Sequence, residues 1–232
     1  MCKLIEIEGT DKSGKETQSK KICEWLNSEG YKCKVISFPQ YDDDSSQYVK
    51  KYLLGELGDV DSVNPYQAGM LFALDRYMTY IKSMKSDMDE YDFIILDRYV
   101  GSNLIHQGAK SMAHITDLRE FTEYWTDFEY NKLELPRPDI TLILLTSPEA
   151  SEIIAKGRHN KINDSEEEDI HEANREYEER CYETASALSY LLNWNPIYTD
   201  NYRYNNENPF VRTIDDIFDA IKLTLEYNQI VW

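Results

Sequence analysis

Apolar residues along the chain recur in two alternating patterns, short β-branched runs and longer stretches with helical periodicity. The runs YDFIILD and DITLILLT are apolar over several consecutive positions, which is typical of parallel strands buried on both faces. Together with weaker segments they predict strands at residues 3–8, 32–38, 91–97, 139–146 and 196–199. The helical periodicity predicts helices at residues 14–28, 45–54, 65–88, 115–131, 148–155, 170–192 and 213–227.

This alternation of strands and helices predicts an α/β fold, with a parallel sheet of about five strands covered by helices on both faces. The length of 232 residues suits one domain with a substantial core. No internal repeat or low-complexity linker divides the chain, so we expect a single domain over residues 1–232. The polar stretch at residues 199–210 is expected to be an irregular surface loop.

Composition and charge narrow the class of protein. No apolar run approaches the length of a membrane span, and Glu6 and Glu8 interrupt the first apolar stretch, so we expect neither a span nor a signal peptide, and a cytoplasmic location. The net charge of -18 disfavours non-specific binding to nucleic acid or to anionic membranes. A small anionic substrate would need a local cluster of Lys and Arg. The four cysteines and four histidines lack disulfide or zinc-site spacing.

The stretch EIEGTDKSGKETQ, residues 6–18, lies between a predicted strand and a predicted helix. It matches the phosphate-binding pattern G-x-x-x-x-G-K-[ST] at Gly9, Gly14 and Lys15, but Glu16 occupies the place of the magnesium-binding hydroxyl. Backbone N–H groups of such a turn and the positive end of the helix point at one spot, where they bind phosphate. The alternative is an ordinary strand-to-helix turn that happens to contain these residues.

Further stretches, in order along the chain, resemble the thymidylate kinase family of nucleoside monophosphate kinases. LIEIEGTDKSGKETQ resembles the P-loop of that family with its aspartate, here Asp11. SFPQY is similar to its Phe-Pro segment, and MLFALDRY to its helix that brings an aromatic ring and an arginine to the nucleotide. ILDRYVGSNLIHQGAK resembles its Asp-Arg-Tyr signature, and LPRPDITLILLTSPEAS and DIHEANREYEE resemble later elements of the family. The matches cover nearly the whole chain.

The resemblance implies a P-loop NTPase-type fold and transfer of the γ-phosphoryl group of ATP to dTMP, which gives dTDP and ADP in dTTP synthesis. Mg²⁺ is the implied cofactor, and ATP and dTMP are the implied ligands. Because two anions react, catalysis depends on positioning and on neutralisation by cations. The family usually forms homodimers through helices beside the active site, so a homodimer is expected.

The resemblance also implies three overlapping sets of site residues. The catalytic residues are expected to be Asp11, Lys15, Arg98 and Arg158. The ATP-binding residues are expected to be Gly9, Lys12, Ser13, Gly14, Lys15, Glu16 and Thr17. The residues that bind the acceptor nucleotide are expected to be Asp11, Phe38, Leu53, Phe72, Arg76, Arg98, Tyr99, Asn103 and Gln107.

Within the acceptor set, Arg76 and Arg98 are expected to hold the phosphate, because a guanidinium group can pair with two phosphate oxygens. Phe72 is expected to stack on the pyrimidine ring, and the amides of Asn103 and Gln107 to pair with the base edge or orient nearby groups. The competing interpretation is a salt bridge for each arginine and core packing for Phe72.

Two further residues concern the sugar and the base. Tyr99 is expected to favour a sugar without a 2′-hydroxyl through close packing, as the family implies. His106 occupies a position where the family often has an aromatic residue, which leaves base packing at that position open.

The metal is expected to be held by Glu16 and Asp97. Asp97 follows a buried strand, where carboxylates organise magnesium directly or through water, and its alternative role is to cap the strand end. Glu16 would bind the metal directly or through water, giving an active site with altered coordination. The lid, roughly residues 156–168, is arginine-poor: Arg158 is its expected main cation, and a solvated basic loop is the alternative.

Two other functions compete with a dTMP kinase. A deoxynucleoside kinase would phosphorylate a neutral nucleoside and would need a carboxylate base near the 5′-hydroxyl, whereas the pair Arg76 and Arg98 favours an acceptor that already carries phosphate. A catalytically silent nucleotide-binding protein is the second alternative, suggested by Glu16 and by the arginine-poor lid.

Overall fold

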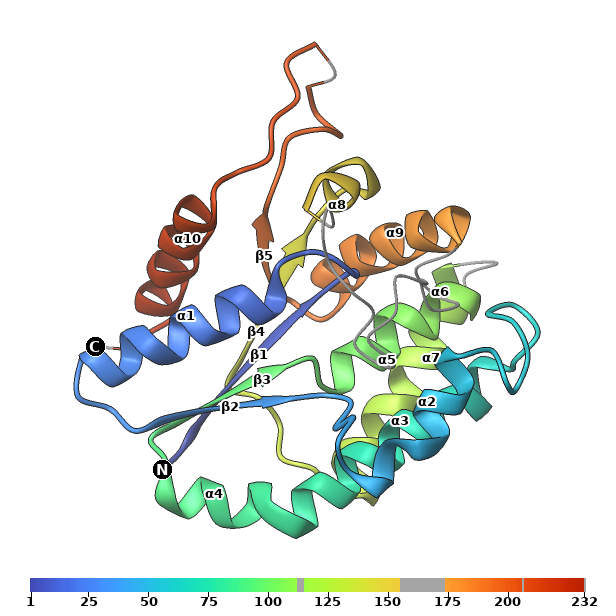
Figure 1. Cartoon of the computed structure of the whole chain (residues 1–232), viewed down its shortest axis with the longest axis horizontal. Helices are drawn as coiled ribbons and strands as arrows, with labels where there is room; N and C mark the ends of the chain where they lie inside the picture. Colours follow the sequence, from blue (N-terminus) through green and yellow to red (C-terminus); the bar gives the residue numbers. More distant parts are fainter. Residues whose placement is uncertain (112–114, 155–173, 206, 232) are drawn as a thin grey trace.

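The computed structural model describes residues 1–111, 115–154, 174–205 and 207–231. Five parallel strands form one sheet in the order β2-β3-β1-β4-β5 (Figure 1). The strands are β1 Lys3–Gly9, β2 Cys33–Ser37, β3 Phe93–Asp97, β4 Ile140–Leu145 and β5 Asn195–Tyr198. The predicted parallel α/β sheet is therefore confirmed. Ile7 pairs with Asp97 on one side and with Leu142 on the other, so the carboxyl ends of the central strands meet at one edge.

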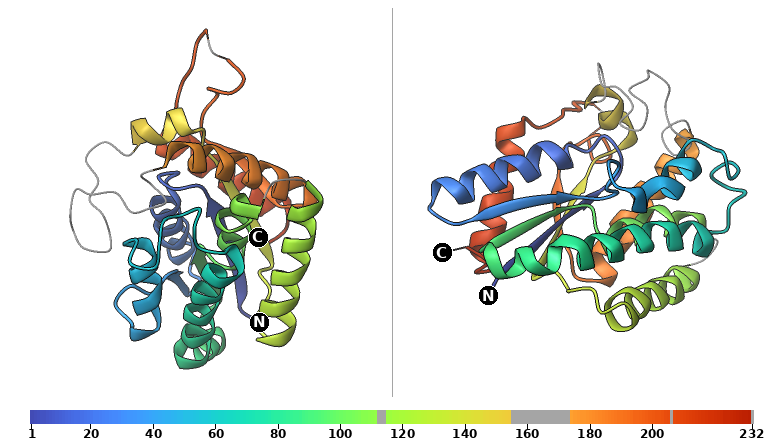
Figure 2. Two further views of the ribbon diagram at one scale, coloured as in Figure 1. Left: turned by 90° about the vertical axis from the view of Figure 1, so that its right-hand side faces the viewer. Right: turned by 60° about the horizontal axis from the view of Figure 1, so that its bottom comes forward.

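Helices cover both faces of the sheet (Figures 1 and 2). Helices α1 (Lys15–Ser28) and α10 (Ile214–Tyr227) pack on the face to which Ile5 and Ile7 of β1 point. Leu4, next to Ile5 in the strand, belongs to the core of the opposite face, as the period of two in a strand requires. The helices not yet named are α2 Gln47–Leu53, α3 Pro65–Thr79, α4 Lys85–Glu90, α5 Val100–His106, α6 Gly108–Ser111, α7 Ile115–Asp127, α8 Pro148–Ile154 and α9 Arg175–Leu191.

Most predicted helices are confirmed, with two details that periodicity does not show. A π-helical turn, Tyr80–Met84, joins α3 to α4, and a second, Phe128–Lys132, extends α7. The pattern predicts no element between residues 97 and 115, where the structure has α5 and α6. Nearly every residue of α5 is buried, so this helix lacks the polar face that makes helical periodicity visible. Residues 170–173 of the predicted helix at 170–192 lie outside the described residues.

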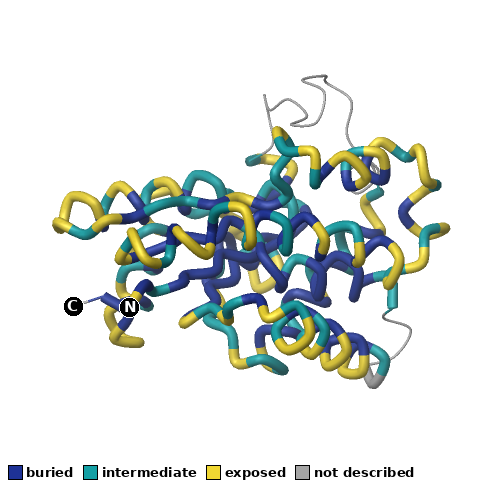
Figure 3. Tube along the Cα trace, turned by 90° about the horizontal axis from the view of Figure 1, so that it is seen from below, coloured by how far each residue is buried: buried dark blue, intermediate teal, exposed yellow. Residues whose placement is uncertain are grey.

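Buried positions gather along the strands and on the helix faces that pack against them (Figure 3). After β5 the chain runs outward as an irregular loop, whose ends are joined by an antiparallel bridge between Asp200 and Val211 (Figure 1). Of the helices that the structure describes, none combines the length and the apolar character that crossing a bilayer requires.

Candidate active site

The turn between β1 and α1 has the backbone that a phosphate-binding loop requires. Gly9 has a φ of 149°, and a Cβ atom there would lie 2.6 Å from the carbonyl oxygen of Leu144. Gly14 has a φ of 89° and precedes the first residue of α1. Both positions therefore need glycine. The turn ends at the N-terminus of a 14-residue helix, whose positive dipole end favours an anion.

Lys15 is buried at the start of α1, with 5% of the residue exposed. Its Nζ donates hydrogen bonds to the carbonyl oxygen of Thr10 and, at 3.1 Å, to Ser13 Oγ. Burial, followed by the charge of Arg98, lowers the pKa of Lys15 to about 7. A phosphate group at the turn would bring negative charge to Lys15 and so favour its protonated form.

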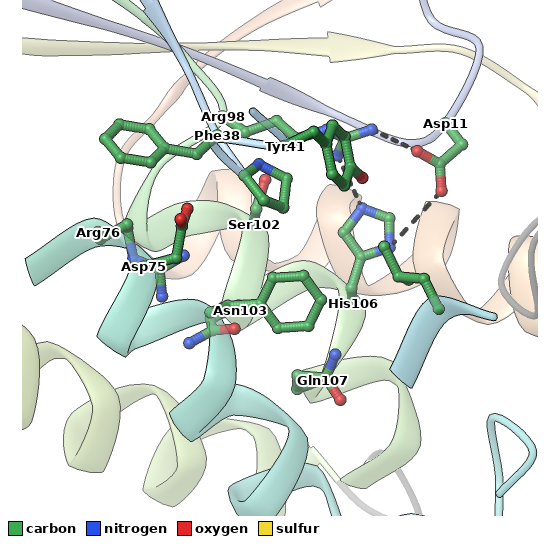
Figure 4. Close-up of a pocket in the computed structure, with 13 residues that line it drawn as sticks. Asp11, Phe38, Tyr41, Asp75, Arg76, Arg98, Ser102, Asn103, His106 and Gln107 are labelled. Carbon is green, nitrogen blue, oxygen red and sulfur yellow. Dashed lines mark hydrogen bonds and ion pairs between the residues drawn. The ribbon is translucent and has the colours of Figure 1, made fainter. Parts of the chain in front are cut away.

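Arg98 follows β3 and links two other side chains of the site (Figure 4). Its Nη2 donates to Asp11 Oδ1, and its Nη1 lies 3.1 Å from His106 Nε2. Burial lowers the pKa of His106 to about 4, so the ring is neutral at pH 7. Because a guanidinium group only donates, His106 Nε2 accepts this bond and Nδ1 carries the ring proton. Nδ1 in turn lies 4.0 Å from Asp11 Oδ2.

A pocket opens beside this group (Figure 4). All the residues predicted to bind the acceptor line it except Tyr99. Tyr99 is fully buried in the core instead, 5.6 Å from the ring of Phe38, and its hydroxyl donates to the carbonyl oxygen of Pro136. The structure therefore corrects the expectation that the Tyr99 ring packs against the sugar. The pocket is also lined by Tyr41, Asp75, Ser102 and His106.

Phe72, Arg76 and the amide side chains of Asn103 and Gln107 are among the residues that line the pocket. Phe72 is half-buried and meets Tyr52 edge to face, with ring centroids 6.0 Å apart. Arg76 donates from Nε and Nη2 to the two carboxylate oxygens of Glu129, each at 2.6 Å, and both side chains are buried. The salt bridge proposed as the alternative for Arg76 is therefore present, while the same residue also lines the pocket.

Gln107 is fully buried, and neither its amide nitrogen nor its amide oxygen has a hydrogen-bond partner within the described part of the chain. Each unpaired buried polar group costs about 1–3 kcal/mol. Because Gln107 lines the pocket, a molecule that pairs with this amide would remove that cost.

The predicted metal ligands lie at the phosphate-binding turn and at the end of β3. Asp97 is buried and accepts a hydrogen bond from Ser37 Oγ at 3.5 Å. Glu16 is half-exposed on α1 and forms an ion pair with Lys20 at 2.7 Å. Nowhere in the residues that the structure describes do three His, Cys, Asp or Glu side chains form a group that could hold a metal ion.

The remaining predicted residues are placed as follows. Thr17 is half-buried in the first turn of α1. Lys12 Nζ lies 3.8 Å from Glu178 Oε1 of α9. Arg158, and with it the predicted lid at residues 156–168, lies outside the described residues.

Comparison with known proteins identifies the family. A family model described as thymidylate kinase matches residues 7–194. The chain belongs to the thymidylate kinase family. Members of this family phosphorylate dTMP to dTDP with ATP as the donor, so the chain is an ATP-dependent phosphotransferase.

Individual thymidylate kinases resemble the chain to different degrees. The thymidylate kinase of Mycobacterium tuberculosis is 32% identical over 156 residues, which cover 67% of this chain and 71% of that protein. The human thymidylate kinase is 27% identical over 141 residues, which cover 61% and 59% respectively. The solved structure of the Candida albicans thymidylate kinase superposes with a TM-score of 0.67 over 98% of this chain and 92% of that one, at 21% identity, and supports the fold.

Proposed function

We propose that the chain transfers the γ-phosphoryl group of ATP to dTMP at the edge of the sheet where β1 and β3 end. The observation that carries the proposal is the placement of two sites side by side. The glycine turn with Lys15 can hold the donor phosphates, and the pocket beside it opens onto Arg98. Asp11 belongs to the turn and to the pocket at once, since it binds Arg98 and lines the pocket.

In this proposal catalysis depends mainly on cationic side chains that bind and neutralise the phosphates. Lys15 contacts the β and γ phosphates of ATP, and Arg98 contacts the phosphate of dTMP and the group in transfer. The bonds from Arg98 to Asp11 and His106 hold the guanidinium in place before the substrate arrives. Positioned charges of this kind stabilise the transition state without reorganising during the reaction.

The donor groups at this edge fit Mg²⁺. Protein sites for Mg²⁺ in kinases usually supply one or two carboxylates, and substrate phosphates and water complete the shell. The carboxylate of Asp97, buried at the end of β3, and the carboxylate of Glu16 are the groups that would hold the ion. When bound, Mg²⁺ neutralises charge on the donor phosphates.

The acceptor base is proposed to lie against Phe72. Its polar edge would face Arg76, Asn103 and Gln107, which are labelled in Figure 4. The unpaired amide of Gln107 supports this placement, because a base edge offers both a donor and an acceptor. The apolar contact with Leu53 and Phe38 would complete the enclosure of the ring.

A coupled assay for ADP, with dTMP present or omitted, tests the proposed reaction. We expect ADP formation that depends on dTMP, and loss of it in Lys15→Ala by a factor of about 10² or more, because the donor phosphates lose their principal side-chain cation. Lys32→Ala, which removes an exposed lysine, serves as the matched control and should retain activity. Phosphorylation of thymidine in place of dTMP would favour a deoxynucleoside kinase. ATP binding without ADP formation would favour a silent nucleotide-binding protein.

We also propose that the chain forms one domain, acts in the cytoplasm and assembles as a homodimer through α3. Exposed apolar residues recur every four positions along this helix at Tyr66, Met70 and Leu74. Such a stripe is unusual on a monomeric surface. Light scattering is expected to give the mass of two chains, and Leu74→Asp to give the mass of one. Leu223→Asp, at an exposed leucine of α10, is the control that should leave the dimer intact.

A further inference from the structure

Glu129 is a fully buried carboxylate that the proposed reaction does not use. It lies in the π-helical turn that extends α7, and none of its side chain is exposed. It accepts hydrogen bonds from two residues that line the pocket. Arg76 donates two bonds, each of 2.6 Å, and Asn103 donates one of 3.1 Å. π-Helical turns often occur at functional sites.

These bonds fix the orientation of the Asn103 amide. Its nitrogen Nδ2 donates to Glu129 Oε1 at 3.1 Å and to the carbonyl oxygen of Gly69 at 3.0 Å. A carboxylate and a carbonyl oxygen only accept hydrogen bonds, so the NH₂ group must face them and the oxygen Oδ1 must face away. Among the described residues, no hydrogen bond uses Asn103 Oδ1.

The same carboxylate determines what Arg76 offers to the pocket. Nε and Nη2 donate to Glu129, which leaves Nη1 without a hydrogen bond among the described residues. The pocket wall therefore carries a donor at Arg76 Nη1 and an acceptor at Asn103 Oδ1. Thymine presents the complementary groups along one edge, the acceptor O4 and the donor N3–H. Cytosine presents the reverse, the donor N4 amino group and the acceptor N3.

We propose that Glu129 is a positioning residue that sets the hydrogen-bonding polarity of this wall, so that the pocket favours bases with an imide edge, thymine and uracil, over cytosine. The proposal rests on the proposed function, because the acceptor base must bind in this pocket. Glu129 acts only through Arg76 and Asn103 and does not touch the substrate. Without its carboxylate the Asn103 amide keeps only its bond to the Gly69 carbonyl, and Nε and Nη2 of Arg76 lose their partner.

Glu129→Gln tests the proposal, since it keeps the size of the side chain but adds a donor and removes the charge. Steady-state kinetics with dTMP, dUMP and dCMP, together with calorimetric binding of the same nucleotides, would be compared with the wild-type chain. We expect the KM for dTMP to rise by about tenfold or more and the preference for dTMP over dCMP to fall by a similar factor. The KM for ATP should stay within twofold of the wild-type value. Glu134→Gln, at an exposed glutamate in the next turn of chain, is the matched control.

A folded Glu129→Gln variant with an unchanged KM for dTMP and an unchanged preference over dCMP would overturn the proposal. If this variant does not fold, Arg76→Met combined with Glu129→Leu replaces the buried pair by apolar side chains, a change that is often neutral or stabilising. The same losses are expected there, and unchanged discrimination would again overturn the inference. Wild-type protein that binds neither dTMP nor dCMP would contradict the proposed function itself. If the wild type and the variant both prefer dTMP over dCMP to the same degree, only the role of Glu129 is contradicted.

Discussion

Glu6 and Glu8 are two buried carboxylates on one face of β1, directly beneath the start of α5. Glu6 accepts hydrogen bonds from the Gly101 N–H at 3.0 Å and from the Thr141 hydroxyl at 2.6 Å. Glu8 accepts hydrogen bonds from the Tyr99 N–H and from the Ser102 hydroxyl, each at 2.7 Å. Burial, followed by the charge of Glu8, raises the pKa of Glu6 from 4.5 to about 8. The folded protein therefore keeps a proton on Glu6 at pH values where the unfolded chain has released it.

The sign of the resulting pH dependence follows from this difference in bound protons. Between about pH 4.5 and pH 8 the folded state binds more protons than the unfolded state at Glu6, so the free energy of unfolding falls as the pH rises. The slope approaches about 1.4 kcal/mol per pH unit inside that interval. Glu6→Gln cannot titrate. Its amide oxygen can accept from the Gly101 N–H, and its amide NH₂ can donate to the hydroxyl oxygen of Thr141. Between pH 5 and pH 7 the wild type should lose about 2–3 kcal/mol relative to this variant.

Urea unfolding of both proteins at pH 5, 6, 7 and 8 measures this difference. Lys15 and His106 titrate in both proteins, so their contributions cancel in the comparison, and the remaining difference reports Glu6 together with its neighbour Glu8, since burial raises the pKa of both. Glu24→Gln, at an exposed glutamate of α1, is the control for removing one carboxylate and should follow the wild type in parallel. Unfolding free energies of the wild type and Glu6→Gln that stay parallel over this range would refute the argument, because Glu6 would then titrate alike in both states.

Three further predictions concern single positions of the site. In Gly101→Ala the new Cβ would lie 2.8 Å from Glu8 Cγ and 3.0 Å from Trp194 Cη2. Thermal unfolding should therefore show a free energy of unfolding lower by about 1–3 kcal/mol, and kinetics should show a lower kcat/KM for dTMP. Unchanged values would show that this packing can relax freely. Gln107→Met removes the unpaired amide, so urea unfolding of the nucleotide-free protein should show a free energy of unfolding higher by about 1 kcal/mol, while the KM for dTMP rises. A lower stability would mean that the amide has hydrogen-bond partners in solution. Glu16→Ser should change the Mg²⁺ concentration for half-maximal activity by about threefold or more, and an identical Mg²⁺ titration would remove Glu16 from the metal site.

The elements that the sequence predicts well are those with one buried and one exposed face, or those buried as a continuous apolar run. Strand β3 and helix α1 are of this kind, and both are found at the predicted places. Helix α5 was missed because its residues are buried on nearly every side, which leaves no polar positions to mark the helical period.

For the site, local motifs identify residues that act near one another in the chain. The glycine turn and the pocket residues around Arg98 and Asn103 were identified in this way. Glu129 could not be identified from a local motif, because it lies 53 positions from Arg76. Only the packing of α3 against the turn after α7 brings the two side chains together. A motif also gives no side-chain direction. Arg98 has a φ of 66°, and Tyr99 directly after it turns its ring into the core instead of the pocket.

The central claim is that the glycine turn and the adjoining pocket together transfer a phosphoryl group from ATP to dTMP. Following the phosphoryl group itself tests this claim most directly. The full chain would be incubated with ATP labelled at the γ-phosphate, Mg²⁺ and either dTMP, thymidine or neither, and the products separated. We expect label in dTDP when dTMP is present, no labelled thymidine product, and loss of the labelled dTDP in Lys15→Ala but not in Lys32→Ala. Label that remains in ATP, or that appears only as inorganic phosphate in the presence of dTMP, would contradict the account.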